Sequence, residues 1–198
     1  MINSAASEPD PNLYQWHYTR GWKLVEGLLL LDGKRRRFLT WFRRRRLRKA
    51  LVHFTSALEL FPSMWQCMMA VGKIHQRLGE HDEALAWFRR AQELAPSESA
   101  VAREAGIEAL ETRDVPFAEQ CFRTAIRAKP EDAGLLSNLA IAELMAGSVD
   151  DAKQHVAEAV ARDPSDKVAA AVRRAVERVQ SGRATVPRSM SEVRMLAK

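Results

Sequence analysis

The sequence predicts an all-α fold built from repeated pairs of antiparallel helices. The main observation is a period of 34 residues, because Pro62, Pro96, Pro130 and Pro164 stand 34 positions apart. Two columns of alanine and one of large apolar residues recur in the same phase. No segment alternates apolar and polar residues with the period of two that a half-buried strand requires. A fixed period of this length is the signature of a helical repeat protein.

The three columns explain how the two helices of one repeat can pack. Small alanines let the helices approach closely, and the larger side chain fills the space beside them. Each proline stands just past a second helix, which it cannot continue. Ser99, Asp132 and Asp166 are candidate N-caps for the helices that follow. The columns are Ala50, Ala84, Ala118 and Ala152; Phe54, Phe88, Phe122 and Val156; and Ala57, Ala91, Ala125 and Ala159.

The same columns divide the chain into segments. A repeat region is predicted over residues 63–166, with repeats at 65–98, 99–132 and 133–166. An amphipathic helix over 167–181 is expected to cap the last repeat, because terminal repeats need a polar outer face. The remaining segments are a flexible N-terminal tail over 1–11, a divergent helical hairpin over 12–62 and a mobile C-terminal tail over 182–198. Within that tail, residues 191–197 could form a short helix.

The residues of these repeats resemble the tetratricopeptide repeat family. The first repeat carries the fullest signature, which is Gly72, Gly79, Ala84, Phe88, Ala91 and Pro96. His75, Ala109 and Glu143 stand where the family usually has tyrosine. The resemblance implies a right-handed superhelical solenoid of antiparallel helix pairs. It also implies a non-catalytic scaffold that binds another protein or peptide.

The first helix of the N-terminal hairpin has two possible positions. Counting back one period places it over 34–42, with Phe38 where later repeats have glycine. A break at Asp32–Gly33 instead gives one helix over about 12–31 and a second over about 34–61.

The second arrangement contains a conflict of helical phase. Residues 38–42 place their apolar side chains on a different face from those of residues 47–61. Either the helix breaks near 43–46, or its first third contacts a different neighbour. The preceding helix is one such neighbour, and Gly21 within it permits close approach.

Charge is concentrated in one segment of the chain. Residues 34–49 hold ten Lys or Arg and no Asp or Glu, whereas the whole chain has a net charge of +6. The other residues therefore carry 21 − 25 = −4. Cations interleaved with aromatic residues suit an anionic membrane surface or a nucleic acid, although the segment could equally pack as a cap. The candidate anion-binding residues are Lys34, Arg35, Arg36, Arg37, Trp41, Arg43, Arg44, Arg45, Arg46, Arg48 and Lys49.

Signals of an enzyme or of a metal site are missing from the sequence. The five histidines include no pair at helical metal-ligand spacing, and no nucleophile motif occurs. Cys67 and Cys121 lie in different repeats and are expected to be small buried side chains. We therefore expect no catalytic residues, no cofactor and no small-molecule substrate.

Two cysteines and no secretory signal indicate a cytoplasmic protein, with a peripheral membrane location if residues 34–49 bind lipid. The excess of Arg over Lys hints at a bacterial source.

A binding groove follows from the resemblance, because the first helices of the family line a concave surface. Mapped onto this chain, the groove residues are Met69, Lys73, Gln76, Arg103, Ile107, Leu110, Asn138, Ile141, Leu144 and Met145. Six of them are apolar, which suits an amphipathic helix or an extended segment of a partner. Lys73, Arg103 and Asn138 do not reproduce the set with which some family members clamp a peptide carboxylate. Alternatively, the chain's own tail or its N-terminal helix fills the groove.

Overall fold

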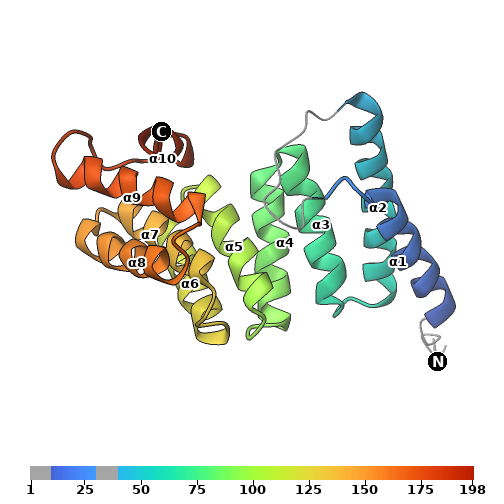
Figure 1. Cartoon of the computed structure of the whole chain (residues 1–198). Helices are drawn as coiled ribbons and strands as arrows, with labels where there is room; N and C mark the ends of the chain where they lie inside the picture. Colours follow the sequence, from blue (N-terminus) through green and yellow to red (C-terminus); the bar gives the residue numbers. More distant parts are fainter. Residues whose placement is uncertain (1–9, 30–39) are drawn as a thin grey trace, which may run out of the picture. The chain divides into compact units, whose positions relative to one another are not determined.

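The computed structural model describes residues 10–29 and 40–198, and in these residues it contains ten helices and no strand (Figure 1). The helices fall into two compact units, Met1–Leu94 and Ala95–Lys198, which we call unit 1 and unit 2. The predicted all-α helical-repeat class is confirmed. None of the described helices combines the length and the apolar character needed to cross a membrane.

Unit 1 consists of two antiparallel helical hairpins. Its helices are α1 (Pro11–Val25), α2 (Trp41–Leu60), α3 (Trp65–Leu78) and α4 (His81–Leu94). Helix α1 packs against α2, α2 against α3, and α3 against α4. The core contains side chains from all three phased columns, which are Ala50, Phe54, Ala57, Ala84, Phe88 and Ala91, all fully buried.

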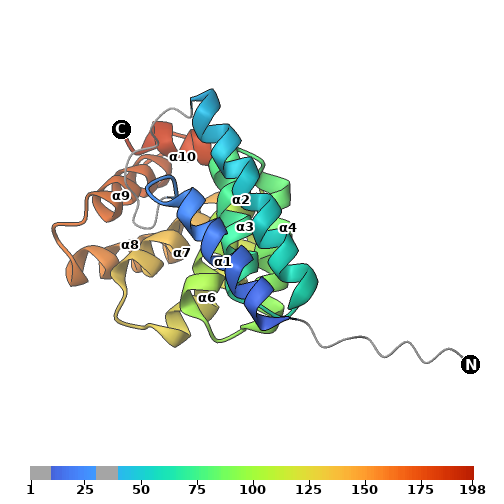
Figure 2. The ribbon, with the colours of Figure 1, turned by 90° about the vertical axis from the view of Figure 1, so that its right-hand side faces the viewer.

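Unit 2 contains two further hairpins and a C-terminal helix pair. Its helices are α5 (Ser99–Glu111), α6 (Val115–Ala128), α7 (Ala133–Ala146), α8 (Val149–Arg162), α9 (Lys167–Gln180) and α10 (Met190–Leu196). Helix α9 packs against α7 and α8, as the first helix of a further repeat would. Figure 2 shows α9 and α10 from a second direction.

Local sequence explains where three of the helices in unit 2, α6, α7 and α9, begin. The carboxylates of Asp114, Asp132 and Asp166 accept N–H groups of the first helical turn at 3.3, 3.0 and 2.7 Å. Ser99 differs from its prediction as an N-cap, because it is already the first residue of α5. Its hydroxyl instead donates to the carbonyl of Ala125 at 3.2 Å and so ties α5 to α6.

A glycine meets a buried phenylalanine where the two helices of a hairpin cross. A Cβ atom on Gly72 would lie 2.5 Å from the ring of Phe88, and one on Gly106 would lie 2.6 Å from the ring of Phe122. These distances are shorter than van der Waals contact, so only glycine lets the ring pack against the helix backbone.

The N-terminal hairpin uses the same contact through a different glycine. A Cβ atom on Gly21 would lie 2.8 Å from the ring of Phe54. Helix α1 is therefore the first helix of this hairpin, and the position over 34–42 obtained by counting one period back is wrong. Helix α2 begins at Trp41, after Thr40, and continues through 43–46 without a break. Phe38 lies outside the described residues.

The C-terminal segment contains a helix. The sequence predicts a mobile tail over 182–198 with a short helix over 191–197 as an alternative; Met190–Leu196 forms α10, which agrees with the alternative. Pro187 and Val193 are buried, and Ser189 caps the helix by accepting the N–H of Glu192 at 3.4 Å. Burial of two apolar side chains supplies the hydrophobic contribution that a free tail lacks.

Candidate protein-binding faces

In unit 1 the predicted groove residues lie along α3. Met69, Lys73 and Gln76 are half-buried, whereas the neighbouring Val71 and Ile74 are fully buried. The helix therefore turns one side toward the core and keeps Met69, Lys73 and Gln76 within reach of solvent. We call these three residues the unit 1 face.

In unit 2 the predicted groove residues divide by exposure. Arg103 and Ile107 on α5 and Asn138 on α7 are half-buried. The other four are buried, with exposed fractions of 2% for Leu110, 7% for Ile141, 0% for Leu144 and 9% for Met145. Helix α7 packs against α5, α6, α8 and α9, which explains why its apolar residues are covered. Most of the apolar strip expected on α7 is therefore closed to solvent.

The C-terminal segment lies against two of the first helices of unit 2. Figures 1 and 2 both show α10 beside α9, and the two helices are in contact. Arg194 of α10 forms an ion pair with Glu111 at the end of α5. Arg174 of α9 donates two hydrogen bonds to the carbonyl of Ala197, at 3.1 and 2.8 Å. We call the solvent-facing side of α5, α7 and α9 the unit 2 face.

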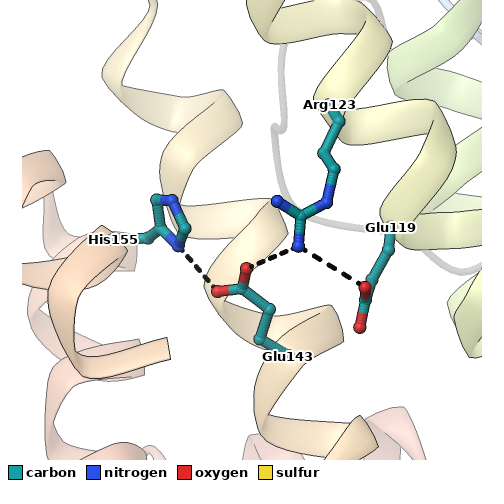
Figure 3. A network of polar contacts seen from close by, with 4 residues as sticks. All are labelled: Glu119, Arg123, Glu143 and His155. Atoms are coloured by element: carbon teal, nitrogen blue, oxygen red, sulfur yellow. Dashed lines mark hydrogen bonds and ion pairs between the residues drawn. The ribbon is translucent and has the colours of Figure 1, made fainter. Parts of the chain in front are cut away.

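A buried carboxylate connects three helices of unit 2 (Figure 3). Glu143 on α7 is 1% exposed, and its Oε2 lies 2.8 Å from His155 Nδ1 on α8. Its Oε1 accepts a hydrogen bond from Arg123 on α6 at 3.1 Å. Burial raises the pKa of Glu143, and His155 and Arg123 only partly oppose this effect. Glu119, 3.6 Å from Arg123, completes the network.

The equivalent position in unit 1 also carries a His–Glu pair. His75 Nδ1 lies 2.8 Å from Glu80 Oε2, and Glu80 in turn pairs with Arg48 of α2. Both pairs stand where the family usually has tyrosine. The sequence did not predict them, because the partners are five and twelve residues apart and meet only across the turn of a hairpin. We assign both to packing between helices, since each joins two or more helices.

The basic segment exposes its aromatic residues. Trp41 and Phe42, at the start of α2, are 63% and 73% exposed. The guanidinium of Arg45 lies 5.5 Å from the centre of the Trp41 ring, a cation–π contact. Arg46 donates to the carbonyl of Leu24 at 3.2 Å. The candidates Lys34, Arg35, Arg36 and Arg37 lie outside the described residues; Arg44, Arg48 and Lys49 are exposed and Arg43 is half-buried.

Two histidines far apart in sequence meet between α1 and α2. His17 Nδ1 and His53 Nδ1 lie 3.2 Å apart, in hydrogen-bonding distance. Burial, with the neighbouring His17 and Arg20, lowers the pKa of His53.

Within residues 10–29 and 40–198, no group of three or more His, Cys, Asp or Glu is arranged to hold a metal ion. Burial raises the pKa of Cys67 to about 11, so its thiol is protonated at neutral pH.

Comparisons with solved structures agree with this architecture. YrrB, described as a tetratricopeptide protein with an unusual peptide-binding site, is 15% identical, with a TM-score of 0.68 over 97% of this chain and 91% of YrrB. MamA from Desulfovibrio magneticus RS-1 is 14% identical, with a TM-score of 0.72 over 93% of this chain and 95% of that chain.

A third structure is the first tetratricopeptide domain of Spaghetti, bound to the HSP90 peptide SRMEEVD. It is 14% identical, with a TM-score of 0.55 over 59% of this chain and 93% of that domain. At these identities the three likenesses establish the fold.

Comparison of the sequence itself gives the family. No curated protein matches the chain. The model of the tetratricopeptide repeat family matches residues 38–99 and 103–167, more than half of the chain. The chain therefore belongs to the tetratricopeptide repeat family.

Proposed function

We propose that this protein is a non-catalytic scaffold that binds another protein or a peptide through the first helices of its repeats. The observation that carries the proposal is the repeat itself, because stacked helical hairpins present their first helices as an extended binding surface. Two structural neighbours support it, since YrrB is described with a peptide-binding site and the Spaghetti domain with a bound HSP90 peptide.

The half-buried residues of the two faces define the partner's chemistry. Among the half-buried groove residues, each unit has one apolar side chain, Met69 in unit 1 and Ile107 in unit 2, with a cation one turn away. The cations are Lys73 and Arg103. An apolar anchor beside a long polar side chain suits a partner segment that buries an apolar residue and presents an acceptor next to it.

The first experiment captures partners on the wild-type protein and on variants of both faces. We expect Met69→Glu combined with Ile107→Glu to weaken partner binding by at least about tenfold, because a buried charge opposes desolvation of the contact. Val52→Glu combined with Leu94→Glu is the matched control, since these apolar side chains are 63% and 46% exposed on the second helices α2 and α4, outside both faces. Affinity purification with mass spectrometry followed by titration of the captured protein measures the difference. Equal affinity of both double variants for the captured protein would exclude these two faces as its binding site.

A second candidate function rests on the exposure of Trp41 and Phe42 next to a run of arginines. We propose that the start of α2 docks on an anionic membrane surface, with the two rings entering the interface and the arginines meeting lipid headgroups. Helix α2 has no acidic residue in its first turn, which leaves the positive charge there without local compensation.

Vesicle binding tests this candidate. The full chain should bind vesicles containing phosphatidylserine at about 50 mM salt, and lose most of that binding at about 500 mM, because screening shortens the field of the arginines. Trp41→Ala with Phe42→Ala should weaken binding, whereas Leu13→Ala with Val186→Ala, which changes exposed residues elsewhere, should not. Binding to RNA that survives the double aromatic change, with none to vesicles, would favour a nucleic acid instead.

A further inference from the structure

The C-terminal segment, residues 183–198, lies against α9 and contacts the end of α5, two of the helices to which the scaffold function assigns a partner. We propose that this segment is a resident ligand of the unit 2 face, and that an external partner binds there by displacing it. The inference rests on the proposed function, because it names how access to one of the binding faces is controlled.

The segment is held by two buried apolar side chains. Pro187 is buried, and Val193 is 3% exposed in the middle of α10. Met195, two residues further on, is 59% exposed. Helix α10 therefore has one side against the protein and one in solvent, which is the pattern of an amphipathic peptide bound to a groove.

Polar contacts hold the end of the segment through its backbone. Arg174 donates to the carbonyl of Ala197, and Arg178 donates to the carbonyl of Leu196 at 3.4 Å. These carbonyls belong to the last turn of α10, where no helical N–H is left to pair with them. The two arginines of α9 thus bind only backbone carbonyls of the docked helix. Because these contacts do not depend on side-chain identity, the arginines would bind the end of another short helix in the same way.

One side-chain contact adds specificity. Arg194 pairs with Glu111 on α5, whose side chain is 15% exposed. The segment has four cations, Arg183, Arg188, Arg194 and Lys198, against one acid, Glu192, a net charge of 4 − 1 = +3. A competing partner should therefore be a short helix with an apolar residue directly followed by a basic one, as Val193 and Arg194 are.

The contacts of the C-terminal segment are also weak enough for the segment to leave the face. An isolated helix of the length of α10 is not stable in water, so the segment unfolds when it leaves the face. The Arg194 side chain of its ion pair is 51% exposed, so solvent weakens the attraction to Glu111, which is itself 15% exposed. Segments with few buried apolar contacts open locally at low free energy, while the remainder of the fold stays intact.

The test uses the full chain and a synthetic peptide of residues 183–198 as the probe. Val193→Asp removes the buried anchor and should release the segment. Isotope-labelled Val193→Asp protein is titrated with the wild-type peptide up to about 1 mM. The amide signals of Glu111, Arg174 and Arg178 should then move toward their positions in the wild-type spectrum. The wild-type protein should need at least about tenfold more peptide, because its face is free in only about a tenth of the molecules or fewer.

Met195→Asp is the matched control, because it places the same charge on the solvent side of the same helix. It should behave as wild type. Arg194→Glu, which changes an exposed residue, is the second variant in case Val193→Asp does not fold. It places a negative charge next to Glu111, so it should also release the segment and increase binding of the added peptide. No peptide-dependent shifts in either Val193→Asp or Arg194→Glu would overturn the inference, as would equal binding to wild type and variants.

Failure of this inference and failure of the scaffold function give different results. If captured partners bind wild type and Val193→Asp equally, yet are lost from Met69→Glu with Ile107→Glu, the segment is not a competitor but the faces are binding sites. If the double face variant keeps its partners, the scaffold proposal itself fails. A partner that binds Val193→Asp at least about tenfold more tightly than wild type supports both.

Discussion

Replacing Phe122 by alanine is expected to lower the free energy of unfolding by about 3–5 kcal/mol, the usual range for truncation of a buried phenylalanine. Phe122 is fully buried, and its ring lies where a Cβ atom on Gly106 would be 2.6 Å away. The space left by the ring cannot close easily, because the glycine has no side chain to move into it. Urea denaturation followed by far-UV circular dichroism measures the loss.

Phe42→Ala is the matched control for this change. It makes the same substitution at a ring that is 73% exposed, and it should alter the free energy of unfolding by less than about 0.5 kcal/mol. Equal effects of Phe42→Ala and Phe122→Ala, or a loss below about 1 kcal/mol for Phe122→Ala, would be incompatible with the repeat core described above.

His155→Ala is expected to destabilise unit 2 by about 3 kcal/mol at pH 7, because it leaves the buried carboxylate of Glu143 without one of its two partners. Lys153→Ala, an exposed change on the same helix, should have almost no effect. Thermal or urea denaturation of the two variants gives the comparison. A His155→Ala protein as stable as the Lys153→Ala protein would show that the Glu143 network contributes nothing to stability.

The cost of His155→Ala should also depend on pH. Burial raises the folded-state pKa of Glu143 above its ordinary value of 4.5. The neutral carboxyl is therefore favoured by folding, so its contribution to stability is complete below pH 4.5 and is lost as the pH rises through the raised pKa. Removing His155 takes away a contact that favours the charged form, so the penalty should shrink between pH 7 and pH 5. A penalty independent of pH would indicate lost packing alone.

Much of the fold was predictable because residues at fixed positions within each repeat determine how its two helices pack. Alanines, phenylalanines and prolines at a fixed period marked the hairpins of residues 65–166. The fixed period misplaced the first helix of the N-terminal hairpin, whereas the division at Asp32–Gly33, with close approach at Gly21, agrees with α1 and α2 as its two helices. Its helices are joined by residues 26–40, whereas only Gly79 and Glu80 separate α3 from α4. The contact between Gly21 and Phe54 is kept although the spacing between its two residues is not, and a fixed period cannot detect this.

The candidate site was less predictable because exposure depends on distant elements. The resemblance indicated which residues lie on first helices, but Ile141, Leu144 and Met145 are covered once α5 and α9 pack beside α7. The pairs His17–His53 and Glu143–His155 join different helices, so no local sequence motif predicts these contacts. A short helix over 191–197 and a tail that fills the groove were both open alternatives from the sequence. The contacts that hold residues 183–198, two buried side chains and three arginines, join segments distant in the chain and could not be predicted.

The measurement that tests the protein-binding proposal most directly is a titration of a captured partner into the isotope-labelled full chain, with amide signals assigned to each helix. The proposal predicts that the largest changes fall on the first helices, around Met69 on α3 and Ile107 on α5, and that Met69→Glu with Ile107→Glu removes them. Changes confined to the second helices α4, α6 and α8, and unaffected by that double substitution, would contradict it.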